Sequence, residues 1–324
     1  MPGLLRIAVQ PDVRRLPRDS FAEVWVAELT RRGHAVDVVD VFAPDAIARI
    51  QRCDGFLWWF TPTRFPRELG KRLVQALDHA GGPLLFPDAR SVWHFDDKVA
   101  QYYLLQAAGI PMPRTWVFWE REAAAEFCRT ATFPLVVKLA AGHDSNHVAL
   151  LRNAREARRW IGRLFGRGVA SFTERLRIRR WPDTQQGYLL VQEFLSENTF
   201  DTRVTVIGDR AFAFRRFNRP NDFRASGSGI RDLDPAGIAA DAVQLAFRPA
   251  RAVGAASLCV DVLRRGSEPV ISEMSYYYEG FKVEACPGHW TAGGAWHEGQ
   301  LHPAKAILDD FLAKLAVRPA ARTP

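Results

Sequence analysis

The sequence has few of the features that mark several common protein classes. Cysteine accounts for four of its 324 residues, and no two of them have CxxC spacing, which excludes a disulfide scaffold and a cysteine-type zinc ribbon. No apolar run reaches the roughly 18 residues that a membrane helix needs. The first ten residues lack a charged stretch followed by a long apolar run, so we expect no signal peptide. These absences predict a cytoplasmic protein without a membrane partner.

Several chemistry-bearing motifs are absent as well. The chain contains no GxSxG elbow, no GxxxxGK[ST] phosphate loop and no GxGxxG turn. His143 and His147 are four residues apart, but the pattern around them predicts a loop followed by a strand rather than a zinc-binding helix. Cys286 and His289 have no further ligand-type residues at metal-site spacing. We therefore expect no zinc centre at either pair.

The composition is that of a folded protein with a basic surface. Hydrophobic residues make up 48% and charged residues 25%, close to the averages for globular domains. The length favours about two domains, at about 150 residues each. The formal net charge of +8 favours anionic partners, which include nucleotides, acidic metabolites and nucleic acid. The charge alone does not choose among them.

The first 92 residues alternate between short apolar strands and amphipathic helices. This alternation predicts a small parallel α/β domain. Ser20 is the expected N-cap of the first helix, and Gly33 is expected to end it. The predicted strands cover 4–9, 35–42, 54–60 and 83–86, and the predicted helices cover 20–32, 45–52 and 65–79.

From residue 93 to about 316 the pattern changes to short strands interrupted by helices, which predicts an α+β body. The tail at 317–324 is expected to fray. We expect helices at 97–108, 121–129, 153–165, 235–253 and 303–316. We expect strands at 115–119, 134–139, 147–151, 188–193, 202–207, 210–216, 257–263 and 269–274.

Two carboxylates stand out in the last pair of strands. If 257–263 and 269–274 form a hairpin centred on Ser267, Asp261 lies directly opposite Glu273. Like charges facing each other are unfavourable unless a divalent cation lies between them, and oxygen ligands suit Mg²⁺. Ser275, two residues after Glu273, faces the same side. The alternative is a pair of solvated carboxylates on an exposed face.

Basic side chains accompany other predicted strands. Lys138 ends the otherwise apolar strand 134–139, so its head must reach either solvent or an anion. Lys98, at the start of a helix, is by itself expected on the surface. Four arginines near the strands 202–216 either clamp phosphate or carboxylate groups or cover a solvated sheet face. They are Arg203, Arg215, Arg216 and Arg224.

A second basic run covers residues 152–180, with aromatic residues interleaved. Such a run is compatible with nucleic-acid binding. In an arginine-rich protein it more simply forms the solvated face of a helix, and we expect no nucleic-acid partner. The run contains Arg152, Arg155, Arg158, Arg159, Arg163, Arg167, Arg175, Arg177, Arg179 and Arg180.

Taken in order, seven segments resemble the ATP-grasp superfamily, and within it the RimK-like branch of the ribosomal-protein glutamate ligase and the glutathione-synthetase-like enzymes. The resemblance implies a small Rossmann-like pre-ATP-grasp domain (1–92) and an ATP-grasp domain (93–316). The latter would contain a lid at about 115–193 and a catalytic sheet at about 194–316, which together clasp ATP. The segments are DDKVAQYYLLQAAGIPMP (96–113), FPLVVKLAAG (133–142), LLVQEFL (189–195), DTRVTVIGDRAFAFRRF (201–217), NDFRASG (221–227), VDVLRRG (260–266) and ISEMS (271–275).

The resemblance also implies roles for individual residues. Lys98 and Lys138 match lysines that contact the ATP phosphates, and Asp201 matches a residue that reaches the ribose. Arg216 and Arg224 match arginines near the phosphates and the acyl-phosphate. The hinge that holds the adenine is matched by Gln192, Glu193, Phe194 and Leu195, and the ligands of Mg²⁺, or of Mn²⁺ in its place, by Asp261, Glu273 and Ser275.

Three departures from the family pattern are visible. Ser275 stands where the third metal ligand is usually Asn, and Ser226 replaces a second Asn near the phosphates. The phosphate-covering loop at 142–147 has a single glycine, Gly142, although glycines let backbone N–H groups approach phosphate. This loss allows His143 or His147 to contact phosphate instead. We expect an active enzyme despite these changes.

The implied function is an ATP-dependent carboxylate–amine ligase that forms an amide through an acyl-phosphate. The aromatic segment 276–302 is interpreted as a substrate wall suited to a sugar ring, which favours joining an amino acid or amine to a sugar acid or small carboxylate. A hydrophobic cap on the sheet is the alternative for that segment. A non-ligating ATP-binding protein and a nucleic-acid-binding protein remain alternative functions. The family resemblance is compatible with a homodimer or homotetramer.

Overall fold

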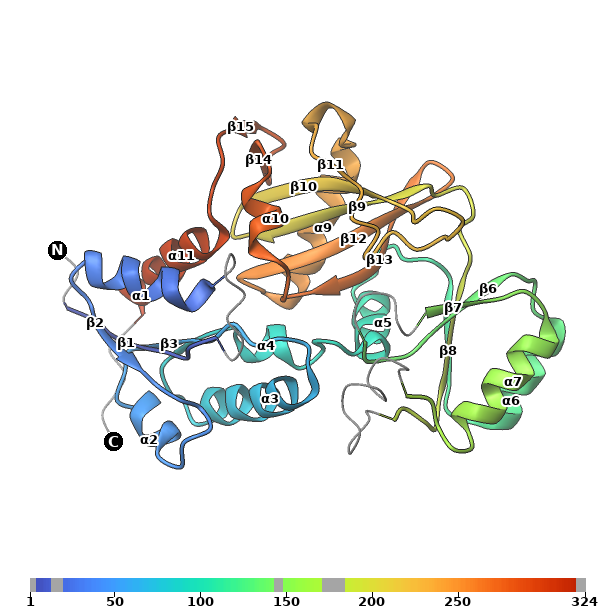
Figure 1. Cartoon of the computed structure of the whole chain (residues 1–324), viewed down its shortest axis with the longest axis horizontal. Coiled ribbons are helices and arrows are strands. Elements are labelled where there is room, and N and C mark those ends of the chain that lie inside the picture. Colours follow the sequence, from blue (N-terminus) through green and yellow to red (C-terminus); the bar gives the residue numbers. More distant parts are fainter. Residues whose placement is uncertain (1–3, 13–19, 143–147, 171–183, 319–324) are drawn as a thin grey trace.

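The computed structural model describes residues 4–12, 20–142, 148–170 and 184–318, and in these residues the chain forms three β-sheets (Figure 1). One sheet is parallel and comes first in the sequence. The other two are antiparallel and face each other across the helix α5 (Lys98–Ala107). None of the helices in the described residues combines the length and the apolar character that crossing a membrane requires.

The first sheet confirms the predicted parallel α/β region. Its strand order is β2-β1-β3-β4, and all three pairings are parallel. Ser20 caps α1 as predicted, accepting a hydrogen bond from the N–H of Glu23 at 3.0 Å. The elements are β1 (Arg6–Val9), α1 (Phe21–Arg31), β2 (Ala35–Val38), α2 (Ala46–Ile50), β3 (Gly55–Leu57), α3 (Arg64–His79), β4 (Leu84–Phe86) and α4 (Ala89–Val92).

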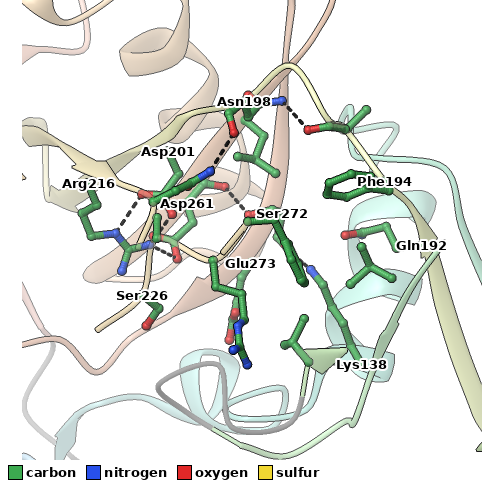
Figure 2. Close-up of a pocket in the computed structure, with 18 of the residues that line it drawn as sticks. Lys138, Gln192, Phe194, Asn198, Asp201, Arg216, Ser226, Asp261, Ser272 and Glu273 are labelled. Atoms are coloured by element: carbon green, nitrogen blue, oxygen red, sulfur yellow. Dashed lines mark hydrogen bonds and ion pairs between the residues drawn. The ribbon is translucent and has the colours of Figure 1, made fainter. Parts of the chain in front are cut away.

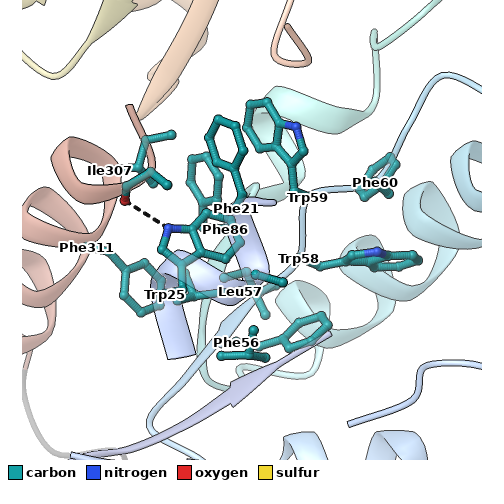
Figure 3. Close-up of a cluster of buried hydrophobic side chains, with 14 of the residues drawn as sticks. Phe21, Trp25, Phe56, Leu57, Trp58, Trp59, Phe60, Phe86, Ile307 and Phe311 are labelled. Atoms are coloured by element: carbon teal, nitrogen blue, oxygen red, sulfur yellow. Dashed lines mark hydrogen bonds between the residues drawn. The ribbon is translucent and has the colours of Figure 1, made fainter. Parts of the chain in front are cut away.

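The strand predicted at 54–60 ends early, because its last residues build a core instead of a ladder. Trp58, Trp59 and Phe60 follow β3 and are almost fully buried. Phe21 of α1 stacks on Trp59 with ring centroids 4.0 Å apart (Figure 3). Aromatic rings bury large apolar areas, so this cluster supplies much of the packing energy of the region.

The last helix, α11 (Pro303–Val317), completes the same core. The indole N–H of Trp25 in α1 donates to the carbonyl of Ala304 at 2.9 Å, and Phe311 packs beneath it (Figure 3). Gly55 permits this approach, since a Cβ there would lie 2.6 Å from the ring of Phe311. The domain boundary at residue 92 stays a prediction, but the chain's final helix shares a core with the first sheet.

Two tyrosines at the start of the aromatic segment 276–302 do not form the substrate wall that was expected there. Tyr276 is fully buried and donates its hydroxyl to the carbonyl of Phe60 at 2.5 Å. Tyr278 is 3% exposed and shares a hydrogen bond with Ser257 at 2.8 Å. These tyrosines are the hydrophobic cap, not a substrate wall, because their rings fill the space between the first sheet and the large sheet. Beyond them lie α10 (Gly280–Glu284), β14 (Gly288–Thr291) and β15 (Trp296–Glu298).

The second sheet has the order β5-β8-β6-β7 and is covered by α6 and α7 (Figure 1). Arginines of the basic run that lie on α7 are exposed, which favours the solvated helix face, while residues 171–180 of that run lie outside the described residues. The elements are β5 (Thr115–Phe118), α6 (Arg121–Thr130), β6 (Leu135–Lys138), β7 (Val148–Leu151), α7 (Ala154–Leu164) and β8 (Leu189–Glu193).

The third sheet has the order β13-β12-β9-β10-β14-β15, with β11 paired to β10, and α9 packs on it. The helix predicted at 235–253 starts later, after a 3₁₀ turn at Pro235–Gly237. The elements are β9 (Phe200–Ile207), β10 (Arg210–Phe217), β11 (Arg231–Asp232), α9 (Ala240–Val253), β12 (Ser257–Arg265) and β13 (Glu268–Ser275).

The β12–β13 hairpin confirms that Asp261 faces Glu273. The register changes between Asp261 and Val262, because Val262 pairs with Ile271 and leaves Ser272 as an extra residue. Near the turn the paired positions therefore differ by one from the predicted register. The bulge at Ser272 restores the predicted pairing at the two carboxylates, and bulges commonly re-aim side chains next to active sites.

The shared aromatic core predicts the effect of truncating the last helix. Phe311→Ala removes a buried ring that fills the space above Gly55, and we expect a loss of about 3–5 kcal/mol in the free energy of unfolding. Urea unfolding followed by tryptophan fluorescence measures it. Val317→Ala on the same helix is the control, since Val317 is 81% exposed and its truncation is expected to change stability by less than about 0.5 kcal/mol. Equal effects of the two substitutions would contradict this packing.

Candidate active site

A cavity opens where the two antiparallel sheets face each other (Figure 2). Its walls come from β6 and β8 on one side and from β9, β10, β12 and β13 on the other. Most of the residues predicted from the sequence line it. They are Lys138, Gln192, Glu193, Phe194, Leu195, Asp201, Arg216, Arg224, Ser226, Asp261 and Glu273.

One end of the cavity is apolar and the other is charged. Val136 of β6 and Leu263 of β12 reach it from opposite sheets, next to Phe194 and Leu195. The ring of Phe223 meets that of Phe194 edge-on, with centroids 5.5 Å apart. A flat aromatic heterocycle fits between such surfaces, whereas the charged end suits an anion.

The hinge residues 192–195 all line the cavity, and the side chains of Gln192 and Glu193 also form hydrogen bonds to neighbouring residues. Glu193 accepts hydrogen bonds from the backbone N–H of Arg114 at 2.8 Å and from its Nε at 2.6 Å. Burial favours the neutral acid, but these bonds outweigh it and lower the pKa of Glu193. Gln192 donates to the hydroxyl of Thr115 at 2.9 Å. Both side chains thereby tie β8 to the start of β5. A direct contact between Glu193 and a nucleotide stays a prediction.

At the charged end, Arg216 lies against Asp201 and Asp261 (Figure 2), and Arg203 joins it on Asp261. Arg203 donates to both oxygens of Asp261, at 2.7 and 2.8 Å. Arg216 donates to both oxygens of Asp201 at 2.8 and 2.7 Å, and its NH2 also reaches Asp261 at 2.7 Å. Although burial favours the neutral acid, the two guanidinium groups lower the pKa of Asp261, so it stays ionised.

Arg203 was among the four arginines noted in the sequence but was not one of the predicted site residues. Its position opposite Asp261 follows from the pairing of β9 with β12, in which Asp261 faces Arg203. That pairing joins strands more than 50 residues apart in the sequence, so counting residues within one hairpin does not reveal it.

Two lysines approach Glu273 from different elements. Lys98 is buried at the first position of α5, contrary to the surface position expected from its local sequence, and its Nζ lies 3.1 Å from Oε1 of Glu273. Burial opposes its charge, but Glu273 and Asp96 outweigh that and raise its pKa. Lys138 donates to the carbonyl of Ser272 at 3.3 Å. Burial, with some repulsion from Lys98, lowers the pKa of Lys138 to about 8.

The segment between β10 and β11 folds over the cavity. Asp222 accepts hydrogen bonds from both Nε and NH2 of Arg224, at 2.9 and 2.6 Å. Arg219 donates to the carbonyl of Ser226. These bonds fix Arg224 and Ser226 at the edge of the cavity, where a substrate group can meet them.

The predicted metal ligands are only partly brought together. Asp261 and Glu273 face each other and line the cavity, but the hydroxyl of Ser275 accepts the N–H of Tyr277 at 3.1 Å. Across the described residues, no group of three or more His, Cys, Asp and Glu residues is placed to hold a metal. His143 and His147 lie outside the described residues. Metal binding by Asp261, Glu273 and Ser275 stays a prediction.

Comparison with known proteins identifies the family to which this fold belongs. A model of the RimK-like ATP-grasp domain matches residues 95–278, which include the strands whose residues line the cavity. The chain belongs to the RimK-like ATP-grasp family. It is therefore an ATP-dependent ligase that joins a carboxylate to an amine by a carbon–nitrogen bond.

Two curated relatives and one solved structure illustrate this family membership. The chain is 25% identical over 244 residues to the tetrahydromethanopterin:alpha-L-glutamate ligase of Methanosarcina acetivorans, covering 71% of this chain and 70% of that one. It is 32% identical over 187 residues to a probable alpha-L-glutamate ligase of Xanthomonas oryzae, covering 55% of this chain and 56% of the relative. The crystal structure of a RimK-domain ATP-grasp protein from Sphaerobacter thermophilus shares the fold, with a TM-score of 0.57, 20% identity and coverage of 95% and 99%.

The lowered pKa of Lys138 predicts a proton linkage. At pH 8 about half of Lys138 is neutral, and a phosphate group beside it favours the charged form, so ATP binding should take up about half a proton. ATP affinity should also fall as the pH rises above 8. Calorimetric titration in buffers of different ionisation enthalpy measures the uptake. Lys138→Arg stays charged and should abolish it, and an unchanged uptake in that variant would assign the proton to another group.

Proposed function

We propose that ATP binds in the cavity between the two antiparallel sheets, with its adenine in the apolar end and its phosphates at the charged end. The apolar end is lined by Val136 and Leu263 and bounded by the hinge residues 192–195. Lys98 and Lys138 supply positive charge beside Glu273, and Arg216 supplies it beside Asp261. The observation that carries the proposal is this convergence of two lysines and two arginines on two facing carboxylates, with Lys98 and Lys138 at Glu273 and its neighbour Ser272, and Arg203 and Arg216 at Asp261.

A divalent cation fits the donor set of Asp261 and Glu273. Both offer carboxylate oxygens, both are on adjacent strands, and Mg²⁺ is commonly held by one or two carboxylates together with substrate phosphates. Asp261 already accepts three N–H bonds, while Glu273 has one lysine and remains partly exposed. When bound, Mg²⁺ or Mn²⁺ neutralises phosphate charge.

The chain's own residues then position the reactants. Transfer of the γ-phosphoryl group to a carboxylate gives an acyl-phosphate and ADP, and attack by an amine gives an amide, inorganic phosphate and a proton. Lys98 and Lys138 stabilise the negative charge that shifts onto the leaving ADP. Arg216 and Arg224 are the residues proposed to hold the transferred group and the carboxylate. None of these steps requires a covalent nucleophile from the protein.

For the substrates, we propose an amino acid as the amine and a small carboxylate as its partner. The named activities of the relatives, alpha-L-glutamate ligases, support an acidic amino acid. Arg224 at the cavity edge supports it as well, because guanidinium groups bind carboxylates bidentately, as Arg224 already binds Asp222. The burial of Tyr276 and Tyr278 takes two rings out of the stacking surface that favoured a sugar acid, while Trp296 of the same segment is exposed.

The cellular setting and assembly belong to the same proposal. The four cysteines are free and buried, which supports a reducing compartment such as the cytoplasm. A homodimer or homotetramer is the expected assembly, and light scattering of the purified protein measures it.

The ligase site predicts a specific loss of activity. We expect ADP release from ATP and Mg²⁺ to be stimulated by pooled amino acids with pooled small carboxylates, including sugar acids. We expect Glu273→Gln to lower that stimulated release at least 100-fold, because the side-chain shape is kept while the charge is lost. Coupled measurement of ADP follows the reaction, and the pools are split until the substrates are found.

Glu268→Gln is the matched control for this experiment. Glu268 lies on the same strand at the far end of the hairpin and pairs with Arg265, so its substitution should leave ADP release unchanged. Asp261 is the poorer first target, since its loss leaves Arg203 and Arg216 buried without that carboxylate. ATP binding without any stimulated release would contradict ligation, and a lack of ATP binding would contradict the nucleotide site.

A further inference from the structure

A short segment between β6 and the predicted phosphate-covering loop is fixed by side chains on every side. We define residues 140–142 as the loop stem. It leaves β6 and leads into residues 143–147, which lie outside the described residues. The stem pairs with no neighbouring strand over these residues. Its backbone must therefore find hydrogen-bond partners elsewhere.

All six main-chain polar groups of the stem have partners. The N–H of Ala140 donates to the hydroxyl of Tyr188 at 2.7 Å, and its carbonyl accepts the N–H of Lys98 at 2.9 Å. The Gln185 amide forms both bonds with Ala141, each 2.8 Å long. The hydroxyl of Tyr188 also donates to Gln185 at 2.7 Å, which orients the amide.

Gly142 is held between two charged side chains. Its N–H donates to Oδ1 of Asp96 at 2.8 Å, and its carbonyl accepts from Nζ of Lys98 at 2.9 Å. The φ of Gly142 is +137°, which side chains rarely adopt, so this glycine is required by the backbone. The single glycine of the loop thus stands where the stem needs it.

Asp96 connects this stem to the first sheet and its helices. The other oxygen of its carboxylate accepts from Arg67 of α3, and both side chains are at least 90% buried. The φ of Asp96 is +51°, a left-handed conformation that is uncommon outside glycine and asparagine. Such strain persists when surrounding interactions hold it, and it occurs often at functional sites.

We infer that Asp96 and Gln185 are positioning residues for the nucleotide site, acting through the stem on Lys98. Lys98 touches the stem twice, through its backbone N–H and through its ammonium group, and the same ammonium lies 3.1 Å from Glu273. Displacement of the stem therefore moves the charge that faces the carboxylate.

The inference rests on the proposed ATP site and is tested by binding rather than by ligation. Asp96→Gly keeps the left-handed backbone and removes the carboxylate, and Gln185→Met keeps the side-chain length and removes the amide. Each should weaken ATP binding in the presence of Mg²⁺ at least tenfold in calorimetric titration of the full chain. Adenosine, which has no phosphate, should bind within twofold of the original affinity. A purely structural role would lower the unfolding temperature without this difference between ligands.

Three further variants test the same inference. Asp96→Asn keeps an acceptor for Gly142 and tolerates the left-handed backbone but loses the charge that faces Arg67, so it should lower ATP affinity less than Asp96→Gly does. The double variant of Asp96→Gly with Gln185→Met should lose less than the product of the single losses, since both act on one stem. Glu68→Gln is the matched control. Glu68 is the other carboxylate beside Arg67, with a separation of 3.4 Å, and does not touch the stem.

The outcomes separate the inference from the proposed function. Unchanged ATP affinity in both single variants, with ATP binding intact in the original protein, overturns the inference and leaves the nucleotide site standing. Equal losses for ATP and adenosine also overturn it, because they indicate a general loosening of the cavity. Failure of the original protein to bind ATP overturns the proposed site itself. If Asp96→Gly does not fold, Gln185→Met decides the question alone.

Discussion

Neutralisation of buried carboxylates by arginine is the constraint on which the cavity depends. Asp261 accepts three N–H bonds from Arg203 and Arg216, and Arg216 also holds Asp201. Removing one member of such a buried pair typically costs about 3–5 kcal/mol, because the remaining charge is left without compensation. The four side chains come from β9, β10 and β12, so correct strand register and charge balance require each other. A slip by one residue would turn these groups to the opposite face of the sheet.

The two facing carboxylates differ in how much of their charge is already compensated. Asp261 is buried and its oxygens are occupied by guanidinium groups, whereas Glu273 is partly exposed and shares its charge with Lys98. The bulge at Ser272 brings them opposite each other and turns the Ser272 carbonyl toward Lys138. The network around Asp261 is thus suited to fixing the sheet, and the region around Glu273 is open to an incoming cation or phosphate.

Local patterns in the sequence were enough to predict most elements and the pairing of Asp261 with Glu273, since a hairpin's register follows from its turn. They were not enough for Arg203, whose partner Asp261 lies 58 residues away on another strand, or for Lys98, which is buried by contacts with Gly142 and with Glu273 of β13, both distant in the sequence. The interpretation of Tyr276 and Tyr278 failed for a similar reason. Whether an aromatic ring lines a site or fills a core depends on what packs on it, and here that is the first sheet with α1.

The first sheet and its helices contribute to the site in two physically different ways. Their aromatic core holds α11 through Trp25 and Phe311, and Tyr276 extends that core to the end of the strand that carries Glu273. Arg67 of α3 reaches the other edge of the site through Asp96. Apolar packing is tolerant of small shifts, but a charged hydrogen bond acts over a narrow range of distance and angle. The core therefore sets the approximate placement of the first sheet and its helices against the cavity, and the link from Arg67 through Asp96 to Gly142 sets the fine position of the backbone that faces Lys98.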